Sequence, residues 1–382
     1  MPSAGFAAFG TPGDASLPLT HVFWALAKMR HRVETALVDA FCARLPGRIL
    51  GCMSAEELAL LLSGLALHAH HPGTATVAEA LRCLSTALAA MPRALPPRAI
   101  AESMTALATL AFCACSADGV VANTPSESGG SMLGASADDY SGSVALLVRR
   151  FAEQCDDATG EDLVRLLRAL AVVGCPPQAR SDTARVAVAI AARISDAEAA
   201  QAPPPVLRAT LAHLHQLAEY GRSAQREVCG RGPVVPTVAR AVAEALHGAS
   251  AAVVLEGWRS HAASKARIVG PLQSDVSDVL CSVGVSHSRQ RLSGGAMVAL
   301  ALADFTIAVE IEDGDCILRN THAPCGYALL HRHLVAASGW RVVVVSSYEW
   351  ERCHTLHLKQ QLLVTKLDTA ISAFSAKRAP AC

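Results

Sequence analysis

Apolar residues recur at helical spacing in five places along the first two thirds of the chain, and this repeat constrains the fold most. Each stripe follows the i, i+3, i+4, i+7 pattern of one helix face. The stripes start at Leu19, Leu58, Ile100, Leu163 and Leu207, which are 39, 42, 63 and 44 residues apart. A second apolar helix follows most stripes, so the unit is a helical hairpin of about forty residues. Because one hairpin cannot bury its own stripe, we expect neighbouring hairpins to stack into an α-solenoid.

Local chemistry at the helix starts supports the hairpins. Ser54 with Glu57 matches the capping box, in which a hydroxyl and a carboxylate satisfy free backbone N–H groups, and Thr159 with Asp162 approximates it. Pro97 pre-sets the first turn of another helix. The second helices of the hairpins are expected at residues 77–88, 144–152, 186–194 and 238–246.

The interval of 63 residues has a compositional explanation. Residues 114–143 are rich in Ser, Gly, Asp and Ala, a composition too polar and flexible to pack, so we predict an insertion there. The predicted parts of the chain are an N-terminal extension at 1–17, hairpin repeats at 18–250, a connecting helical segment at 251–295, a C-terminal domain at 296–370 and a tail at 371–382.

Composition limits the partners. Lysine plus arginine and aspartate plus glutamate number 33 each, so no net field draws the whole chain onto a nucleic acid. The 13 cysteines are odd in number and scattered, which favours a reducing compartment over a disulfide framework. No uncharged apolar run reaches the length of a membrane span, so we expect no membrane partner.

The C-terminal part has a different pattern, with strands and helices in alternation. Residues 297–303 and 305–311 are short apolar runs that favour buried strands, and residues 312–315 indicate a polar turn. Residues 327–337 have helical spacing, and 340–345 form a further apolar run. The predicted order is therefore strand, strand, turn, helix, strand and a closing helix.

Six motifs in this region resemble, in order, the RAP domain, the "RNA-binding domain abundant in apicomplexans". They are IAVEIEDG at 307–314, RNT at 319–321, GYALLHRHL at 326–334, GWRVVVV at 339–345, EW at 349–350 and KQQLLVTKL at 359–367. Helical hairpins followed by such a domain resemble the octotricopeptide and FAST-kinase-like organellar proteins. The resemblance implies a mainly α chain, in which a solenoid precedes a small α/β RAP domain of PD-(D/E)XK-nuclease-like fold.

The same resemblance implies a function. We expect a non-catalytic, RNA-associated organellar protein, first of all a structural subunit or assembly component of the mitochondrial ribosome. Its expected partners are RNA, first of all rRNA, and ribosomal or other ribonucleoprotein subunits in the mitochondrial matrix, with a plastid as the alternative. A free RNA-processing or stability factor and a metal-dependent nuclease are the other functions considered. No cofactor and no small-molecule substrate are expected.

A nuclease of this fold needs carboxylates that converge on a divalent cation, and a lysine to handle the attacking water. Glu310, Glu312 and Asp313 could supply the carboxylates. The preceding strand offers Ala299 where relatives often have an acid, the proline and histidine expected after Gly314 are missing, and no lysine follows at the expected distance. We therefore interpret the cluster as degenerate, with no catalytic residue and no metal.

Candidate RNA contacts come from the same domain. Arg319, Arg332, Arg341 and Arg352 could bridge phosphate oxygens, Asn320 lies beside the first of them, and Trp350 could stack on an unpaired base. Each also has a structural alternative, since arginines can pair with the acidic turn and a tryptophan can fill the core.

Three histidines cluster between the helices of the second hairpin. His68, His70 and His71 could in principle bind zinc, but no cysteine or carboxylate partner stands at a familiar spacing. Because a hairpin turn is predicted there, we expect a solvated loop.

Overall fold

Both capping boxes that the sequence predicts are present in the computed structural model. The Ser54 hydroxyl accepts from the Glu57 N–H at 3.3 Å, and the Glu57 carboxylate accepts from the Ser54 N–H at 2.7 Å, where α4 (Ala55–Leu67) begins. Thr159 and Asp162 form the same reciprocal pair at the start of α8 (Gly160–Val173). Both caps satisfy N–H groups that would otherwise lack a partner in the first helical turn.

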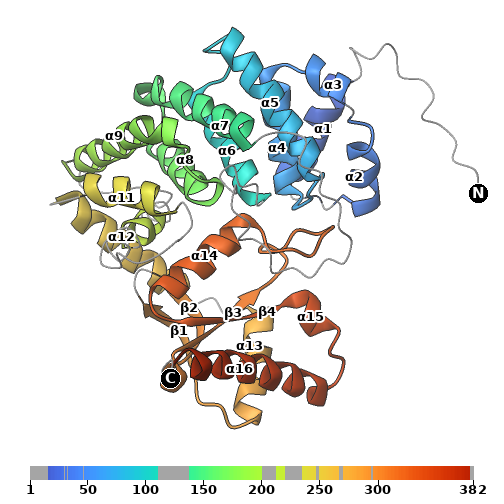
Figure 1. Ribbon diagram of the computed structural model, residues 1–382, viewed down its shortest axis with the longest axis vertical. Coiled ribbons are helices and arrows are strands. Elements are labelled where there is room, and N and C mark those ends of the chain that lie inside the picture. The colour runs from blue at the N-terminus through green and yellow to red at the C-terminus, as the bar shows by residue number, and fades with distance from the viewer. Residues whose placement is uncertain are drawn as a thin grey trace, which may run out of the picture. The chain divides into compact units, whose positions relative to one another are not determined.

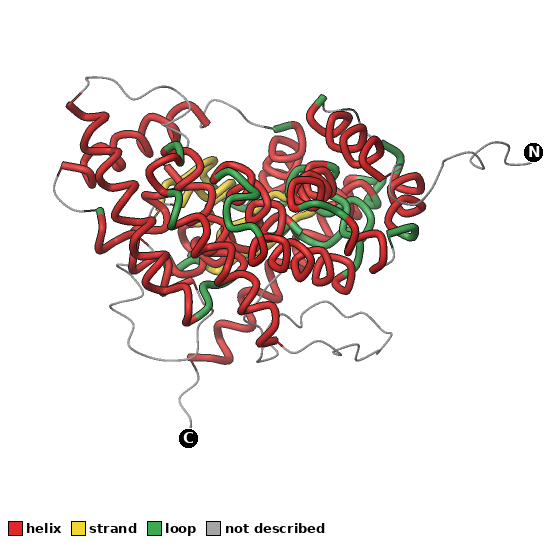
Figure 2. Tube along the Cα trace, turned by 90° about the horizontal axis from the view of Figure 1, so that it is seen from above, coloured by secondary structure: helices red, strands yellow, loops and turns green. Residues whose placement is uncertain are grey.

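The structure describes residues 16–378, except 30, 32, 46, 111–136, 200–211, 220–234, 247–248, 266–269 and 294–295. Within these residues the chain is mainly helical, with one four-stranded sheet (Figure 1 and Figure 2). None of the described helices is long and apolar enough to cross a bilayer. The chain divides into an N-terminal unit, Met1–Ala189 with Arg319–Thr321, and a C-terminal unit, Ile190–Leu318 with His322–Cys382. Each unit is described separately.

Helices of the N-terminal unit pack in two ordered series. Besides α4 and α8, the helices are α1 (Ser16–Lys28), α2 (Thr35–Cys42), α3 (Gly47–Cys52), α5 (Thr74–Ala90), α6 (Pro97–Thr109), α7 (Ala137–Ala152) and the first part of α9 (Arg180–Ala199), whose residues from Ile190 on belong to the C-terminal unit. Helix α4 packs between α1 and α6, and α6 packs in turn against α8. Helix α5 packs against α3, α4 and α7. This is the order of contacts that successive hairpins require, while the solenoid as a whole stays a prediction.

The predicted stripes form the core of this unit. All four stripe positions of α4, α6 and α8 are buried, from Leu58 to Leu170. In α1, Phe23 is buried while Val22 is 54% exposed, because this helix packs mainly against α4. The fifth stripe belongs to the C-terminal unit; its first residues lie outside the described residues, and Leu214 is buried in a helical stretch at 212–219.

Two predictions for the N-terminal unit need correction. Helix α7 begins at Ala137, so the end of the predicted insertion 114–143 is helical, and residues 114–136 lie outside the described residues. The predicted solvated loop is wrong for His68 and His70, which are 4% and 2% exposed. The His68 ring lies 4.4 Å from the Phe23 ring, and the His70 Nε2 atom lies 3.1 Å from an Asp39 carboxylate oxygen. Partners distant in sequence thus make burial of these imidazoles possible.

The C-terminal unit contains the sheet. Its helices are α11 (Val235–Ala245), α12 (Ala249–Lys265), α13 (Pro271–Ser282), α14 (Gly326–Ala337), α15 (Ser347–Glu351) and α16 (Leu356–Arg378), and its strands are β1 (Ser288–Ser293), β2 (Ala296–Leu302), β3 (Ile307–Glu312) and β4 (Arg341–Ser346). The strand order is β1-β2-β3-β4, antiparallel except for the parallel pair β3 and β4, which α14 connects.

Strands β2, β3 and β4 and helix α14 confirm the predicted strand and helix positions within one or two residues. The predicted connecting helical segment 251–295 is wrong at residues 288–293, because these form the edge strand β1. Its sequence SRQRLS is polar and gives no apolar strand signal. The closing helix is longer than predicted, since α16 runs to Arg378 and includes much of the predicted tail 371–382.

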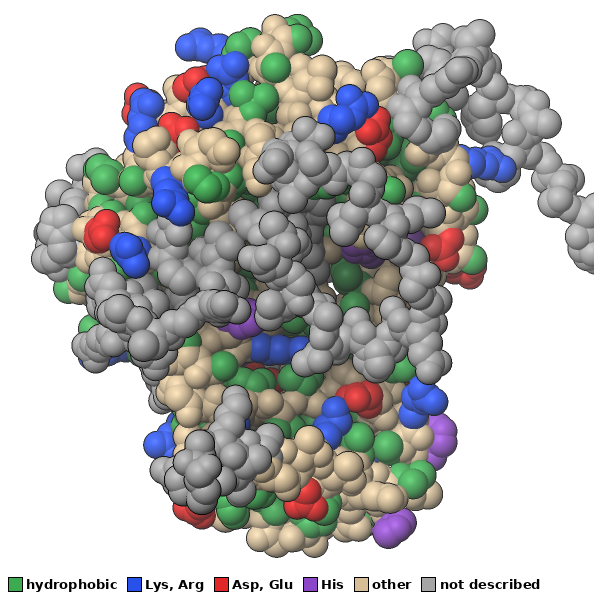
Figure 3. Space-filling model, viewed as in Figure 1, with side chains coloured by type: hydrophobic (Ala, Val, Ile, Leu, Met, Phe, Trp, Pro, Cys, Tyr) green, Lys and Arg blue, Asp and Glu red, His purple; other side chains and the backbone are tan. Residues whose placement is uncertain are grey.

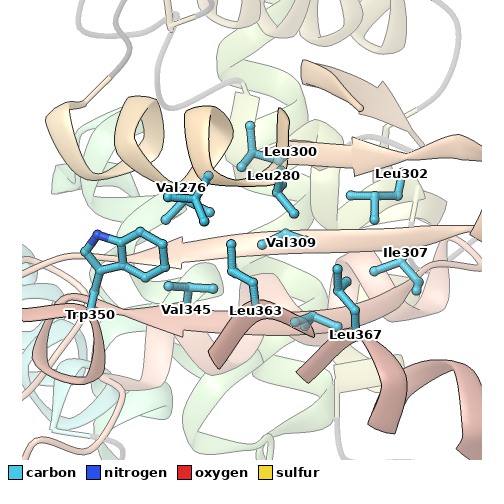
Figure 4. Close-up of a cluster of buried hydrophobic side chains, with 12 residues drawn as sticks. Val276, Leu280, Leu300, Leu302, Ile307, Val309, Val345, Trp350, Leu363 and Leu367 are labelled. Carbon is cyan, nitrogen blue, oxygen red and sulfur yellow. The ribbon is translucent and has the colours of Figure 1, made fainter. Parts of the chain in front are cut away.

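An apolar core fixes one face of the sheet. Figure 4 shows Leu300, Val309 and Val345 of three neighbouring strands meeting side chains of α13 and α16. The other face is covered by α14, which packs against β2, β3 and β4. The sheet therefore lies between two helical layers. The side chains between the sheet and α14 determine the chemistry of the face opposite the apolar core.

Helix α1 crosses α4 closely at Gly64, where an added methyl group would meet the Phe23 ring. A Cβ atom at this position would lie 2.9 Å from Phe23 Cδ1. We expect Gly64→Ala to lower the free energy of unfolding by about 1 kcal/mol, since overpacking outweighs the gain in helix propensity. Thermal unfolding followed by circular dichroism measures the change.

Gly142→Ala is the matched control, because Gly142 lies within α7 and a Cβ atom there has no neighbour within 4 Å. This variant should gain stability. An equal gain in both variants would show that the α1–α4 contact can relax.

Candidate nucleic-acid interface

Glu310 and Glu312 lie two residues apart on β3, so both side chains point to the sheet face that α14 covers. They are 6% and 5% exposed. Glu310 accepts a hydrogen bond from the Ala299 N–H at 3.3 Å, and its other oxygen lies 3.1 Å from His331 Nε2. The strand thus presents its acids to a helix, and each acid has a partner there.

Glu312 forms the stronger of the two contacts. Arg332 of α14 donates to both of its carboxylate oxygens, at 2.6 Å each. Burial raises the pKa of Glu312 above its ordinary value, and the Arg332 guanidinium opposes this shift. A two-pronged contact to a buried carboxylate occupies the guanidinium, so Arg332 serves the fold here.

The third member of the acidic cluster is different. Asp313 follows β3, and its Oδ1 atom accepts from the Asp315 N–H at 3.3 Å, as in a tight turn. Among the described residues, no three His, Cys, Asp or Glu side chains gather closely enough to hold a metal ion. The geometry around Glu310 and Glu312 is therefore that of two acids matched with a histidine and an arginine.

Arg341 and Trp350 are also part of the packing. The Arg341 guanidinium donates to the backbone oxygen of Ala370 at 3.1 Å, and also to that of Phe305. Trp350 is 3% exposed, and its indole N–H donates to Asp275 at 2.7 Å. Base stacking on this indole is excluded while it stays buried, so its core alternative holds in this structure.

Arg319 and Asn320 belong by their contacts to the N-terminal unit. The Arg319 guanidinium donates to the Val33 backbone oxygen at 3.0 Å. Asn320 accepts from the His71 N–H at 3.0 Å and donates to the His71 oxygen at 2.8 Å. These side chains satisfy backbone groups, a role that the RNT motif alone does not reveal.

Arg352 is the exposed member of the candidate set, and its surroundings were not predicted. Its guanidinium carbon lies 5.5 Å from the centre of the Tyr348 ring. The same ring stacks on His322, with ring centres 4.1 Å apart and planes inclined by 12°. We refer to His322, Tyr348 and Arg352 as the planar cluster. Tyr348 is 41% exposed, and the other two residues are also exposed.

Sequence reasoning missed two members of the planar cluster. Tyr348 and Arg352 are one helical turn apart, a spacing that could have linked them. No short-range spacing links His322 to Tyr348, because His322 lies 26 residues earlier in a separate turn.

Charged side chains of both signs are interspersed on the face of the molecule shown in Figure 3. This agrees with the equal numbers of acidic and basic residues. The described residues of this face show no single-sign surface, so recognition of a nucleic acid by them would depend on particular groups.

Removal of the Arg332 guanidinium should leave a buried carboxylate without its cation. We expect Arg332→Ala to lower the free energy of unfolding by about 3 kcal/mol at pH 8. Without the arginine the folded-state pKa of Glu312 rises further above its ordinary value of 4.5. The fold then loses stability as pH rises from 4.5 to the raised pKa, because the folded state must hold an ionised acid without its cation. The loss should therefore shrink towards pH 4.5, which denaturant titrations at the two pH values measure.

Arg82→Ala is the control, because Arg82 pairs with Glu79 on the surface of α5 and its side chain is 58% exposed. It should cost less than about 1 kcal/mol. A loss in Arg332→Ala that does not change with pH would show that Glu312 is not the cause.

No protein-family model matches this chain. Over 85 residues it is 32% identical to a chloroplastic RAP domain-containing protein of Oryza sativa subsp. japonica. The match covers 22% of this chain and 13% of the rice protein. The resemblance to RAP-domain proteins is therefore confirmed by a homologue of that description.

Proposed function

We propose that this chain is a non-catalytic, RNA-associated protein of an organelle. The observation that carries the proposal is the homology with a chloroplastic RAP domain-containing protein. The ordered motifs from residue 307 to residue 367 support it, because RAP is by its name an RNA-binding domain.

Two finer points of the fold belong to this proposal. We propose that the hairpins form an α-solenoid and that the C-terminal unit has the PD-(D/E)XK-nuclease-like fold. The successive packing of α1, α4, α6 and α8 supports the first, and a mixed sheet between helical layers supports the second. A solenoid would offer an extended surface for RNA and protein neighbours.

The non-catalytic part of the proposal is supported by the partners of the acidic cluster. A metal-dependent nuclease needs ionised carboxylates open to a cation. Here His331 and Arg332 contact Glu310 and Glu312, and Ala299 lies beside Glu310 on the neighbouring strand. Arg332 in particular compensates charge that would otherwise attract Mg²⁺.

A ribosomal role is the specific form that we propose first. With charges balanced at 33 of each sign, the chain has the mixed surface of a subunit that touches both RNA and protein. The mitochondrial ribosome is our first proposal for the assembly. The plastid ribosome is the second, since the relative from rice is described as chloroplastic.

Sedimentation of the native protein tests this function. Extracts of isolated mitochondria and plastids are separated on sucrose gradients with and without RNase, and after a wash in high salt. We expect co-migration with a ribosomal subunit that survives the salt wash and is lost after RNase. Mass spectrometry of the fractions identifies the organelle, the RNA-containing particle and the protein neighbours.

Migration as a small RNase-sensitive particle would instead support a free RNA-processing or stability factor. Migration that RNase does not change would contradict an RNA-associated role. Nuclease activity that needs Mg²⁺ and disappears in Glu310→Gln would contradict the non-catalytic assignment, and Asp304→Asn supplies a control acid exposed before β3.

A further inference from the structure

The planar cluster combines two properties, flat side chains and exposure. Apart from Arg352, the RNA contacts predicted in the C-terminal unit lack one or the other. Trp350 is flat but buried, and Arg332 and Arg341 are engaged with a carboxylate and with backbone oxygens. The described residues provide no ion pair for Arg352. The cluster therefore presents π faces and a positive charge at one place on the surface.

The two segments that carry Tyr348 and His322 are each held by hydrogen bonds that involve the backbone. Tyr348 is the second residue of α15, whose start is capped by the reciprocal pair of Ser346 and Glu349. Lys366 donates to the Glu349 carboxylate, so the charge of this nearby acid is compensated. The tyrosine is thus held at the end of β4 by a capped turn and not by a free loop.

The position of His322 is also fixed by its backbone. Its backbone has a left-handed conformation with φ +54°, and its N–H donates to the Leu318 oxygen at 2.8 Å. Leu318 and Ile317 are buried, and Ile317 pairs with Pro324 in a β-bridge. A non-glycine residue in this conformation carries strain that the surrounding turn must support. The turn therefore delivers the imidazole to the tyrosine ring in a preorganised position.

We propose that His322, Tyr348 and Arg352 form a stacking site for an unpaired base of RNA, an inference that rests on the proposed RNA association. Proteins that bind single strands stack bases on aromatic rings and on guanidinium planes. The same guanidinium can contact the adjacent phosphate, which gives a base and its backbone one site. An apolar protein surface matches the cluster less well, because each of its three side chains carries a polar or charged group.

Fluorescence anisotropy with the full chain tests the site. The probes are a fluorescein-labelled oligouridine of about 12 nucleotides and a labelled RNA duplex of equal length. We expect Tyr348→Ala to weaken binding of the single strand roughly fivefold to 100-fold, with a much smaller effect on the duplex. Tyr348→Phe keeps the ring and should stay within about twofold of the unaltered protein.

Arg352→Ala separates the charge from the ring. It should weaken binding and reduce the slope of log affinity against log salt by about one phosphate contact, whereas Tyr348→Ala leaves the slope unchanged. Phe305→Ala is the matched control. Phe305 is 47% exposed and precedes β3, so it lies at the opposite end of the parallel β3–β4 pair from Tyr348. This variant should bind as the unaltered chain does.

Unchanged affinity of Tyr348→Ala for the single strand would overturn the stacking site and leave the proposed function intact. Equal weakening for single strand and duplex, or equal weakening in Phe305→Ala, would also overturn it. The stacking site would also be overturned if Tyr348→Ala lost a protein neighbour while its RNA affinity stayed constant. Absence of RNA binding by the unaltered chain would overturn the site as well, while the sedimentation experiment decides the proposed function separately. Thermal unfolding of each variant identifies changes that act through folding.

Discussion

Parallel pairing of β3 with β4 is the constraint on which the C-terminal unit depends. Parallel neighbours cannot be joined by a tight turn, so the chain must cross over the sheet, and α14 makes this crossing. The crossing places α14 above the side chains of β3 that alternate away from the apolar core. Those side chains include Glu310 and Glu312, so the topology itself requires cationic or polar partners on α14.

His331 and Arg332 meet that requirement from consecutive positions of one helix. The pairing explains why Glu310 and Glu312 need not bind a metal ion, although they stand at positions typical of a metal site. A buried carboxylate costs several kcal/mol unless a partner compensates it, and here the partner comes from the protein. The same contacts occupy the Arg332 guanidinium with Glu312.

Regular parts of the fold could be predicted from the sequence, because short-range patterns determine them. The stripes of α4, α6 and α8 were correct at every position, as were both capping boxes. Strand β1 could not be predicted, because an exposed edge strand carries no apolar alternation. The burial of His68 and His70 escaped prediction for a related reason, since their partners come from distant residues such as Asp39.

Candidate contacts for RNA were harder to predict than the fold, because a sequence shows an arginine but not its partner. Arg319 and Arg341 donate to backbone oxygens, and Arg332 binds a buried acid, so three of the four predicted arginines have partners within the protein. With no excess of positive charge, long-range attraction to RNA would be weak, and short-range contacts would have to supply the affinity of the proposed RNA association. Stacking is such a contact, since it depends on exposed flat surfaces and little on net charge. For the RNA association proposed above, balanced charges therefore favour stacking on unpaired bases over general binding of phosphates, and the planar cluster has the geometry for such stacking.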